Sequence, residues 1–380
     1  MKICAIICEY NPFHNGHLYQ IKQARERSGA DFIVCVMSGD FVQRGENAII
    51  QKHLRAKHAV LAGADAVLQL PTVFSTSNAE LFAKGAVHIL SSIPAVTSLC
   101  FGAEKADKTA FLLGAKFLNE EPKDVSQKIK TSVANGESFA KARANAFAGY
   151  VPFDLLSSPN NILGLEYTRA ILSSGANVEI LPVQRVGGNY LDGDLHENFS
   201  SATAIRKALC LGENVSGNLP PFVLNDLSIE TQADLETLEK YAFLTRSTTE
   251  IKRVCDCTEG LENALKRVAE ENEKIETLVC ARYTASRLRR ISLQNLLQID
   301  ETLIRECLNA PLYLRVLAIR KNCDELLSLL SQSAFPLLIR AHDEAVLGET
   351  AMRCYEKDVF AEKIFALLRK QTNAERTIFV

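Results

Sequence analysis

The sequence predicts an α/β fold in which a parallel sheet is covered by helices on both faces, followed by a mainly α-helical domain. Apolar strand-like runs alternate with helix-like runs up to about residue 210, as in successive βαβ units. Beyond residue 216 glycine becomes sparse and leucine dense. The length of 380 residues suffices for two domains, which we place at residues 1–215 and 216–380.

Each element follows from local patterning. Gly-Asn-Leu-Pro-Pro at 217–221 predicts the boundary, because two prolines interrupt regular structure. Apolar runs predict strands at 3–8, 32–37, 66–70, 96–101 and 178–183. Helical periodicity predicts helices at 17–28, 50–62, 78–91, 106–119, 123–134 and 161–174, and, after the boundary, at 259–275, 281–298, 301–309 and 323–332.

Composition excludes several classes of protein. Hydrophobic residues make up 47% and charged residues 23%, as in an ordinary globular protein, and no apolar run is long enough to span a membrane. We find no signal-peptide layout, so we expect a cytoplasmic protein with its eleven cysteines reduced. Cys255 and Cys257 form the one close pair, without further ligands at metal-site spacing. The net charge of -2 means that a nucleic acid would need a local basic patch.

The first predicted turn carries His14-Asn15-Gly16-His17, between the first strand and the first helix. Open α/β sheets bind ligands at this place, and a helix N-terminus there offers N–H groups and a positive dipole end to phosphate. Two imidazoles three residues apart can add hydrogen bonds where charge grows in a transition state. The pattern therefore indicates a site that cleaves a nucleoside triphosphate at the α-phosphate. A loop with two ordinary polar histidines is the alternative.

Further polar segments follow the later strands. Asp40 and Arg44 lie after the second strand, where they can hold Mg²⁺ and neutralise phosphate, unless the loop is only polar surface. Gly102 ends the fourth strand and gives a nucleotide room at the backbone. Asn160 and Asn161 open a helix and suit either a helix cap or an adenosine contact.

The last such segment spans 184–206. Arg185 follows the fifth strand, and residues 200–206 (SSATAIR) open a helix. Ser201 and Thr203 can bond phosphate and Arg206 can neutralise it, although the same serines make a good N-cap.

These motifs resemble a known family. Residues 14–17 with 200–206 resemble the paired signature of the HxGH nucleotidyltransferase superfamily, which has a Rossmann-like sheet. Residues 8–17 (CEYNPFHNGH), 37–46 (MSGDFVQRGE) and 159–164 (PNNILG) are more specifically similar to the bacterial tRNA(Met) cytidine acetate ligase family. In the helical part, 259–264 (EGLENA) and 282–288 (RYTASRL) resemble the same family. Asn47 departs from it, since proline is expected there.

The resemblance implies an activity. Such enzymes make acetyl-adenylate from acetate and ATP, release pyrophosphate, and acetylate N4 of the wobble cytidine of elongator tRNA(Met). It implies that residues 1–215 are catalytic and that 216–380 bind tRNA. Carried over by motif, with the phosphate-binding residues added, the expected ATP contacts are Ile7, Cys8, Glu9, Tyr10, Asn11, Pro12, Phe13, His14, Asn15, Gly16, His17, Leu18, Tyr19, Gln20, Gly102, Asn160, Asn161, Arg185, Ser201 and Thr203.

We assign roles on that basis. His14 and His17 stabilise the α-phosphate and the leaving pyrophosphate, while Arg206 and the helix start at 200–203 hold the outer phosphates with Mg²⁺. Asp40 is a candidate for Mg²⁺ or for organising acetyl transfer. Expected tRNA contacts are Arg282, Arg287, Arg290 and Arg315, in a stretch with few acids where Tyr283 and Tyr313 interleave. A solvated helix face is the alternative.

Two rival functions stay open from the residues alone. A nucleotidyltransferase acting on a phosphorylated metabolite explains the first half of the chain but leaves the helical part without a task. A non-catalytic RNA-binding protein explains the second half but not the retained histidines, Asp40 and Arg206. The sequence leaves the oligomeric state open, a homodimer included.

Overall fold

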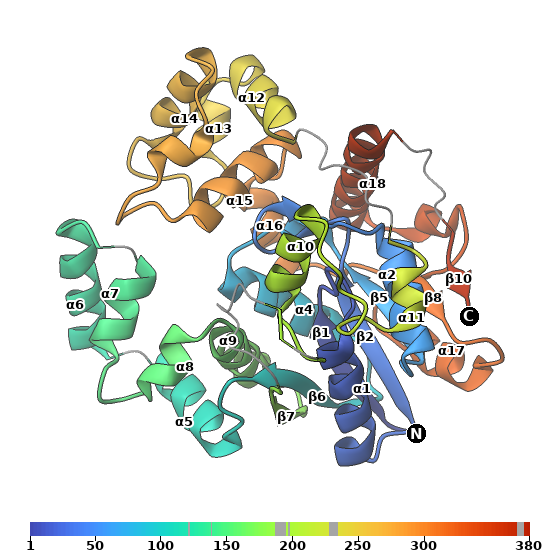
Figure 1. Cartoon of the computed structure of the whole chain (residues 1–380). Helices are drawn as coiled ribbons and strands as arrows, with labels where there is room; N and C mark the ends of the chain where they lie inside the picture. Colours follow the sequence, from blue (N-terminus) through green and yellow to red (C-terminus); the bar gives the residue numbers. More distant parts are fainter. Residues whose placement is uncertain (121, 138, 187–194, 197, 228–234, 371–375) are drawn as a thin grey trace.

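The computed structural model describes residues 1–380 except 121, 138, 187–194, 197, 228–234 and 371–375, and a sheet forms its centre (Figure 1). Eight strands follow the order β10-β8-β5-β2-β1-β6-β7, with β9 beside β8. Their bounds are β1 Ile3–Cys8, β2 Phe32–Ser38, β5 Ala66–Leu70, β6 Val96–Ala103, β7 Glu179–Gln184, β8 Leu314–Ile319, β9 Leu337–Leu338 and β10 Ile378–Phe379. A hairpin of β3 (Phe41–Val42) and β4 (Glu46–Asn47) stands apart.

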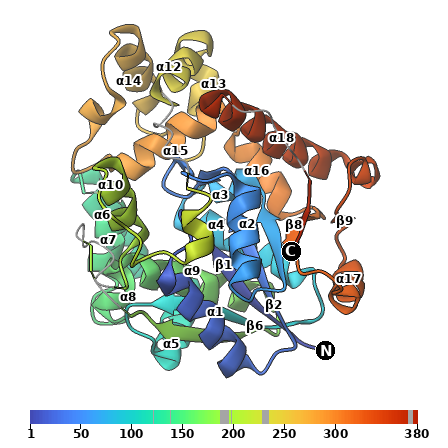
Figure 2. The ribbon, with the colours of Figure 1, turned by 45° about the vertical axis from the view of Figure 1, so that its right-hand side comes forward.

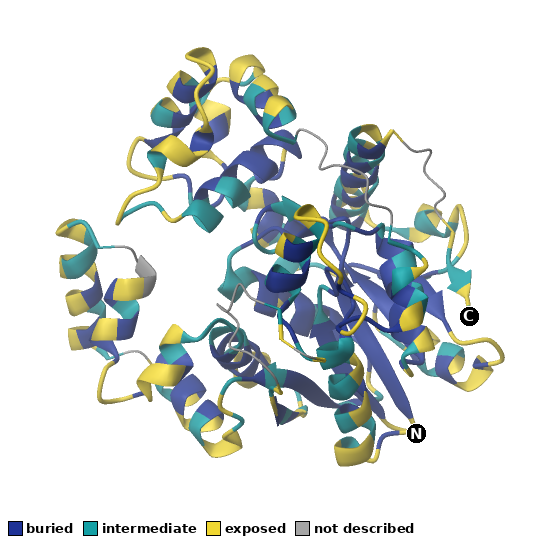
Figure 3. Cartoon of the chain, viewed as in Figure 1, coloured by how far each residue is buried: buried dark blue, intermediate teal, exposed yellow. Residues whose placement is uncertain are grey.

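The five predicted strands are confirmed as β1, β2, β5, β6 and β7. All pairings among them are parallel. Every residue of β2 and β5 is buried, as expected of parallel strands covered on both faces, and the strands appear almost uniformly dark in Figure 3. The predicted α/β fold class is therefore correct.

Helices fill the connections and the second half of the chain. The first half contains α1 Asn15–Ser28, α2 Lys52–Leu61, α3 Thr72–Ser75, α4 Ala79–Ser91, α5 Lys108–Asn119, α6 Lys123–Ala134, α7 Phe139–Ala146, α8 Phe153–Ser157, α9 Pro159–Ser174 and α10 Ala202–Cys210. The second half contains α11 Pro221–Leu224, α12 Leu235–Thr245, α13 Thr248–Lys252, α14 Leu261–Glu270, α15 Ala285–Leu296, α16 Glu301–Leu308, α17 Asp324–Ser331 and α18 Glu349–Arg369. Across the described ranges no helix is long and apolar enough to cross a membrane.

The sequence did not predict the strand that comes from the second half. β8 runs antiparallel to β5, and β9 and β10 extend it on the other side. All six residues of β8 are buried. The part after residue 216 is mainly helical, as predicted, but it also completes the sheet. The domain division at residue 216 stays a prediction.

One group of helices has a core of its own. Phe243, Ile251, Leu265, Leu288 and Ile291 belong to a hydrophobic cluster separate from those around the sheet. They come from α12, α13, α14 and α15, which lie together at one end of the molecule in Figure 2. The rest of the second half, from α16 on, packs on the sheet through the main core.

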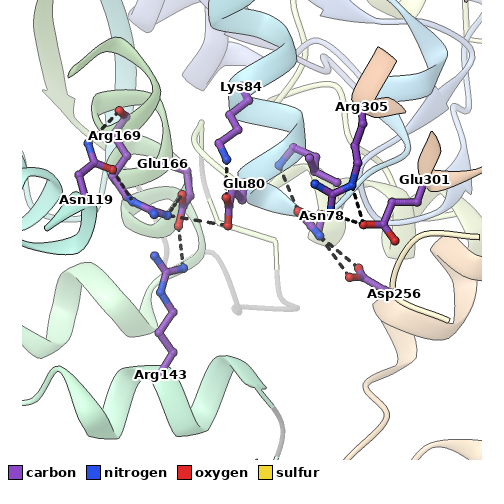
Figure 4. A network of polar contacts seen from close by, with 11 residues as sticks. Asn78, Glu80, Lys84, Asn119, Arg143, Glu166, Arg169, Asp256, Glu301 and Arg305 are labelled. Atoms are coloured by element: carbon purple, nitrogen blue, oxygen red, sulfur yellow. Dashed lines mark hydrogen bonds and ion pairs between the residues drawn. The ribbon is translucent and has the colours of Figure 1, made fainter. Parts of the chain in front are cut away.

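Polar contacts attach peripheral helices to the centre (Figure 4). Glu166 of α9, almost fully buried, accepts from Arg143 of α7 and Arg169 of α9 at 2.7 and 2.6 Å. Asn78, the N-cap of α4, donates to the carboxylate of Asp256 in the segment between α13 and α14. The second contact joins the separate helical group to the sheet layer.

Candidate active site

The turn between β1 and α1 is largely buried, and aromatic side chains pack against it. Tyr10 has a φ of 49° and is 1% exposed, and the Asn11–Pro12 peptide is cis. The rings of Tyr10 and Phe13 lie with their centroids 4.7 and 5.6 Å from that of His17. Aromatic side chains thus form the floor on which the second histidine rests.

The two histidines cap α1 reciprocally. The Nδ1 of His14, the N-cap residue, accepts from the backbone N–H of Gly16 at 3.1 Å, and the backbone N–H of His14 donates to Nδ1 of His17 at 3.2 Å. The rings stack with centroids 3.6 Å apart. A Cβ at Gly16 would lie 2.9 Å from Cε1 of His14, so glycine is needed for the ring and not only for a ligand. The first helical N–H groups, predicted to face phosphate, are therefore already occupied: Asn15 N–H donates to Asn218 O at 3.0 Å.

This capping sets the protonation of both rings. A neutral ring that accepts through Nδ1 carries its proton on Nε2. Burial, with Arg185 and Arg206 nearby, lowers the pKa of His14 to about 3, and burial together with His14 holds the pKa of His17 well below its usual value. Within the described part of the chain neither Nε2 has a partner. The pair therefore presents two neutral N–H donors.

Arginines border the histidines. Arg206, in the second turn of α10, donates to Asn11 O at 2.8 Å and lies 3.7 Å from the carboxylate of Glu46. Glu46 also pairs with Arg289 of α15. Glu46 therefore joins the β3–β4 hairpin, the predicted catalytic arginine and the helical group, a role that the sequence did not indicate.

A pocket opens beside the histidines. His14, His17, Gly102 and Arg185 line it, together with Gly16, Tyr19, Gln20, Val183, Gln184, Val186, Phe199 and Ser200. It has about 40 Å³ of free space, so bound ATP would require a wider site than this one. Arg185 follows β7 directly and its backbone N–H donates to Ala103 O at 3.0 Å, which brings it next to the end of β6.

Several predicted ATP contacts do not line this pocket, and some of them bond the protein's own backbone. Glu9 accepts from Gln43 N–H at 2.7 Å, and burial raises its pKa. Asn11 accepts from Ile49 N–H at 2.9 Å. Four of these predicted contacts are 6% exposed or less, namely Ile7, Tyr10, Asn11 and Phe13. Their side chains are covered by protein, so a contact with ATP would have to use their backbone atoms. Leu18, Cys8, Pro12 and Asn15 do not line the pocket, and contact with ATP stays a prediction for them.

Asn160 and Asn161 lie in the first turn of α9, where both bond Glu104. Asn160 Nδ2 donates to Glu104 Oε1 at 2.6 Å, and Asn161 N–H donates to Glu104 Oε2 at 3.0 Å. Asn161 is fully buried, and its side chain also bonds Lys105 N–H and Asp154 O. The N-cap residue of α9 is Ser158, so neither asparagine side chain is the predicted cap of this helix. An ATP contact stays a prediction for both asparagines. The glutamate that organises this helix start was not predicted.

Asp40 lies behind the site. It is 4% exposed, and its Oδ1 accepts from Lys52 N–H at 2.9 Å. Arg55, fully buried in α2, donates to the carbonyls of Glu9, Gly39 and Ile50, which fixes the turns after β1 and β2. Sequence patterning gave no signal for this arginine. Among the residues described, no three His, Cys, Asp or Glu side chains gather as metal ligands. Binding of Mg²⁺ by Asp40 stays a prediction.

One of the two serines before α10 is its N-cap, and the other bonds a neighbouring loop. Ser201 Oγ accepts from Ala204 N–H at 3.0 Å as the N-cap, and Ser200 Oγ accepts from Asn218 Nδ2 at 3.1 Å. Thr203 Oγ1 lies 3.5 Å from Arg206. Capping, which we kept as the alternative, accounts for Ser201, and the predicted phosphate contacts of Ser201 and Thr203 stay predictions.

The predicted tRNA arginines divide into two places. Arg287 donates to Asp256 O at 2.8 Å and to Thr258 Oγ1 at 2.9 Å, while Arg290 is 13% exposed in its side chain and lies 3.9 Å from Asp256. The side chain of Arg282 is 37% exposed and lies 3.6 Å from the carboxylate of Glu259. Arg315 does not lie on this face. It is buried in β8 and pairs with Glu362 at 2.6 Å, so its place in an exposed patch was wrong.

Comparisons with known proteins find relatives along the whole chain. A HIGH nucleotidyl transferase family model matches residues 1–378. A tRNA(Met) cytidine acetate ligase of Thermoanaerobacter sp. is 35% identical over 100% of this chain and 98% of its own length, and that of Clostridium tetani is 34% identical over 98% and 97%.

The chain belongs to the tRNA(Met) cytidine acetate ligase family. The predicted family is therefore confirmed, and the protein is an enzyme of the ligase class. A crystal structure of Thermotoga maritima TmcAL bound with alpha-thio ATP superposes with a TM-score of 0.89 at 29% identity, over all of both chains. The resemblance to this ligase family thus extends to the whole fold.

Proposed function

We propose that this ligase makes acetyl-adenylate from acetate and ATP and passes the acetyl group to N4 of the wobble cytidine of elongator tRNA(Met), giving N4-acetylcytidine. The single observation that carries the proposal is the reciprocal histidine cap, with two neutral Nε2–H donors next to Arg185 and Arg206. The names of the relatives and the nucleotide in the Thermotoga structure support the substrates.

In the first half-reaction an acetate oxygen attacks the α-phosphorus and pyrophosphate leaves. Acetate is already ionised at neutral pH, so no base is required. Nε2–H of His14 and His17 donate to the phosphate oxygens on which charge accumulates, and being neutral they neither lose nor take a proton. Arg206 leaves Glu46 to neutralise the outer phosphates. Mg²⁺ stays a prediction, and no step depends on a protein-held ion.

In the second half-reaction the cytidine amine attacks the acetyl carbon. The C–N bond forms, the bond from the acetyl carbon to the phosphate oxygen breaks, AMP leaves, and the amine loses one proton. We expect the cytidine to approach from the side of α15, since the contacts of Glu46 with Arg206 and Arg289 place that helix beside the site. Of the predicted tRNA contacts, Arg282 has a side chain that is 37% exposed, and Arg287 and Arg290 contribute through the surface that they hold in place.

Two assays test the proposal separately. Acetate-dependent exchange of pyrophosphate into ATP reports adenylate formation without tRNA. Transfer of labelled acetate to an unmodified tRNA mixture reports the second half and identifies the RNA. Exchange without acetate, or label entering no RNA, would contradict the acetate ligase assignment and favour transfer of adenylate to a metabolite.

A further inference from the structure

A second cavity lies at the opposite end of the sheet from the histidines. The start of α2, strands β8, β9 and β10, and α18 surround it. Its volume is about 610 Å³, within the range of small-molecule sites, about 300–1,000 Å³. Strands β5, β2 and β1 separate it from the pocket at the start of α1. It is therefore not part of the site described above.

The cavity is positively charged. Arg315, Arg340 and Arg376 line it, against one carboxylate, that of Glu344. Arg315 is ion-paired with Glu362, whereas Arg340 and Arg376 are exposed and have no ion-pair partner in the described segments. Guanidinium groups without a carboxylate favour a phosphate, which they can bind through paired hydrogen bonds.

A buried histidine supplies an unsatisfied polar atom at the inner wall. His53 is 5% exposed and its Nδ1 lies 3.4 Å from Leu317 O, while its Nε2 is buried with no partner among the residues described. Burial, with Lys52 and Arg315 adding to it, lowers the pKa of His53 to about 3, so the ring is neutral. An unpaired buried polar atom costs free energy, which a donor group on a ligand would recover.

Aromatic rings complete the lining. Tyr355 of α18 lies under the guanidinium of Arg315, with the ring centroid 5.2 Å from Cζ, and Phe379 of β10 is 50% exposed. A phosphate alone is far smaller than the cavity. A ligand that also has a planar ring, which stacks on Phe379, and a group that donates a hydrogen bond to His53 would fill the remaining space.

We propose that this cavity binds a nucleoside monophosphate, either free or as the phosphorylated end of an RNA strand. The phosphate binds Arg340 and Arg376, the base stacks on Phe379, and an N–H or O–H of the nucleoside donates to Nε2 of His53. The proposal does not depend on the acetate ligase assignment, because none of these residues belongs to the pocket of His14 and His17.

The chain contains no tryptophan, so a single one placed in the cavity reports on this site alone. Phe379→Trp is titrated with AMP, CMP, adenosine and inorganic phosphate, and Phe153→Trp, on α8 at the other end of the sheet, is the control. We expect saturable quenching by both nucleotides in the first variant only. Adding Arg340→Ala and Arg376→Ala should weaken it at least about tenfold. Adding His17→Ala should leave it unchanged.

A 5′-phosphorylated RNA pentanucleotide distinguishes the two sources. Tighter binding of the oligonucleotide than of AMP assigns the site to a strand end, and the reverse assigns it to the free nucleotide. Binding of neither, equal affinity for inorganic phosphate and AMP, or no effect of the two arginine changes would overturn the proposal. Should the tryptophan disturb β10, equilibrium dialysis of labelled AMP into the unaltered chain decides the same question. The matched variant Arg340→Ala/Arg376→Ala should bind one AMP fewer per chain, and equal stoichiometry would overturn the proposal.

Discussion

The histidine turn at the start of α1 and the arginines of α15 both gather polar groups at the beginning of a helix, yet they use them differently. In each histidine, Nδ1 accepts a hydrogen bond from a backbone N–H and Nε2 has no partner among the described residues. Arg287 spends its guanidinium on the segment at Asp256 and Thr258. A polar cluster can thus bind a ligand when its internal hydrogen bonds leave one polar atom of each side chain without a partner. When those bonds use all the polar atoms, the cluster stabilises the fold instead.

The largest effect expected from this comparison is on chemistry. His14→Ala or His17→Ala removes an Nε2–H donor to the reacting phosphate, so acetate-dependent pyrophosphate exchange should fall at least about a hundredfold. Loss of the cap should cost only about 1 kcal/mol of stability. His342→Asn, an exposed histidine distant in sequence and outside the pocket, is the control. Exchange within a few-fold of the unaltered protein would place the chemistry elsewhere.

The opposite behaviour is expected at α15. Arg287→Ala removes four hydrogen bonds from a charged donor, so the free energy of unfolding should drop by about 1.5–3 kcal/mol. Arg282→Glu, at a side chain that is 37% exposed, should leave stability within about 0.5 kcal/mol and weaken tRNA binding with a changed salt dependence. Urea denaturation and filter binding at several salt concentrations measure both. Equal stability of the two variants would break the comparison.

Acidification provides a third test. The pKa of His14 is lower in the folded protein, about 3, than in the unfolded chain, about 6.5, so the unfolded state takes up the proton first. Its contribution to stability is complete above about pH 6.5 and is lost as the pH falls toward 3, by up to about 1.4 kcal/mol per pH unit. Urea denaturation at pH 7.5 and 5 should therefore show a smaller loss in His14→Asn. Parallel losses in both proteins would contradict the neutral ring.

The smallest effect concerns the contact between the β3–β4 hairpin and α15. Gly45 has a φ of +74°, and a Cβ there would lie 2.6 Å from the backbone of Arg289 and Arg290. Gly29, at a φ of +59°, has nothing within 4 Å of that position. Gly45→Ala should cost more than Gly29→Ala, about 1–3 kcal/mol against about 1 kcal/mol, when both are followed by thermal unfolding. Equal losses of stability in the two variants would mean that the β3–β4 hairpin and α15 are not in close contact.

Local patterns predicted much of this molecule. The five parallel strands and the histidine turn depend on neighbouring residues, so periodicity and spacing reveal them. β8 was missed because its six residues, a short apolar run next to helices, become a strand only by pairing with β5. Arg315 was misplaced for the same reason, since only that pairing buries it against Glu362. The roles of Arg55, Glu46 and Glu104 depend on partners far away in the sequence, which no single segment encodes.

The antiparallel pairing of β8 with β5 also has a consequence for how the protein is made. Until residues 314–319 leave the ribosome, the hydrogen-bonding edge of β5 has no partner, and β8 itself lacks β10 until residues 378–379 follow. An open apolar edge is a template for pairing with other chains. The sheet formed by residues 1–215 therefore stays incomplete during most of the protein's synthesis. A fragment ending near residue 215 should aggregate under conditions in which the whole chain does not.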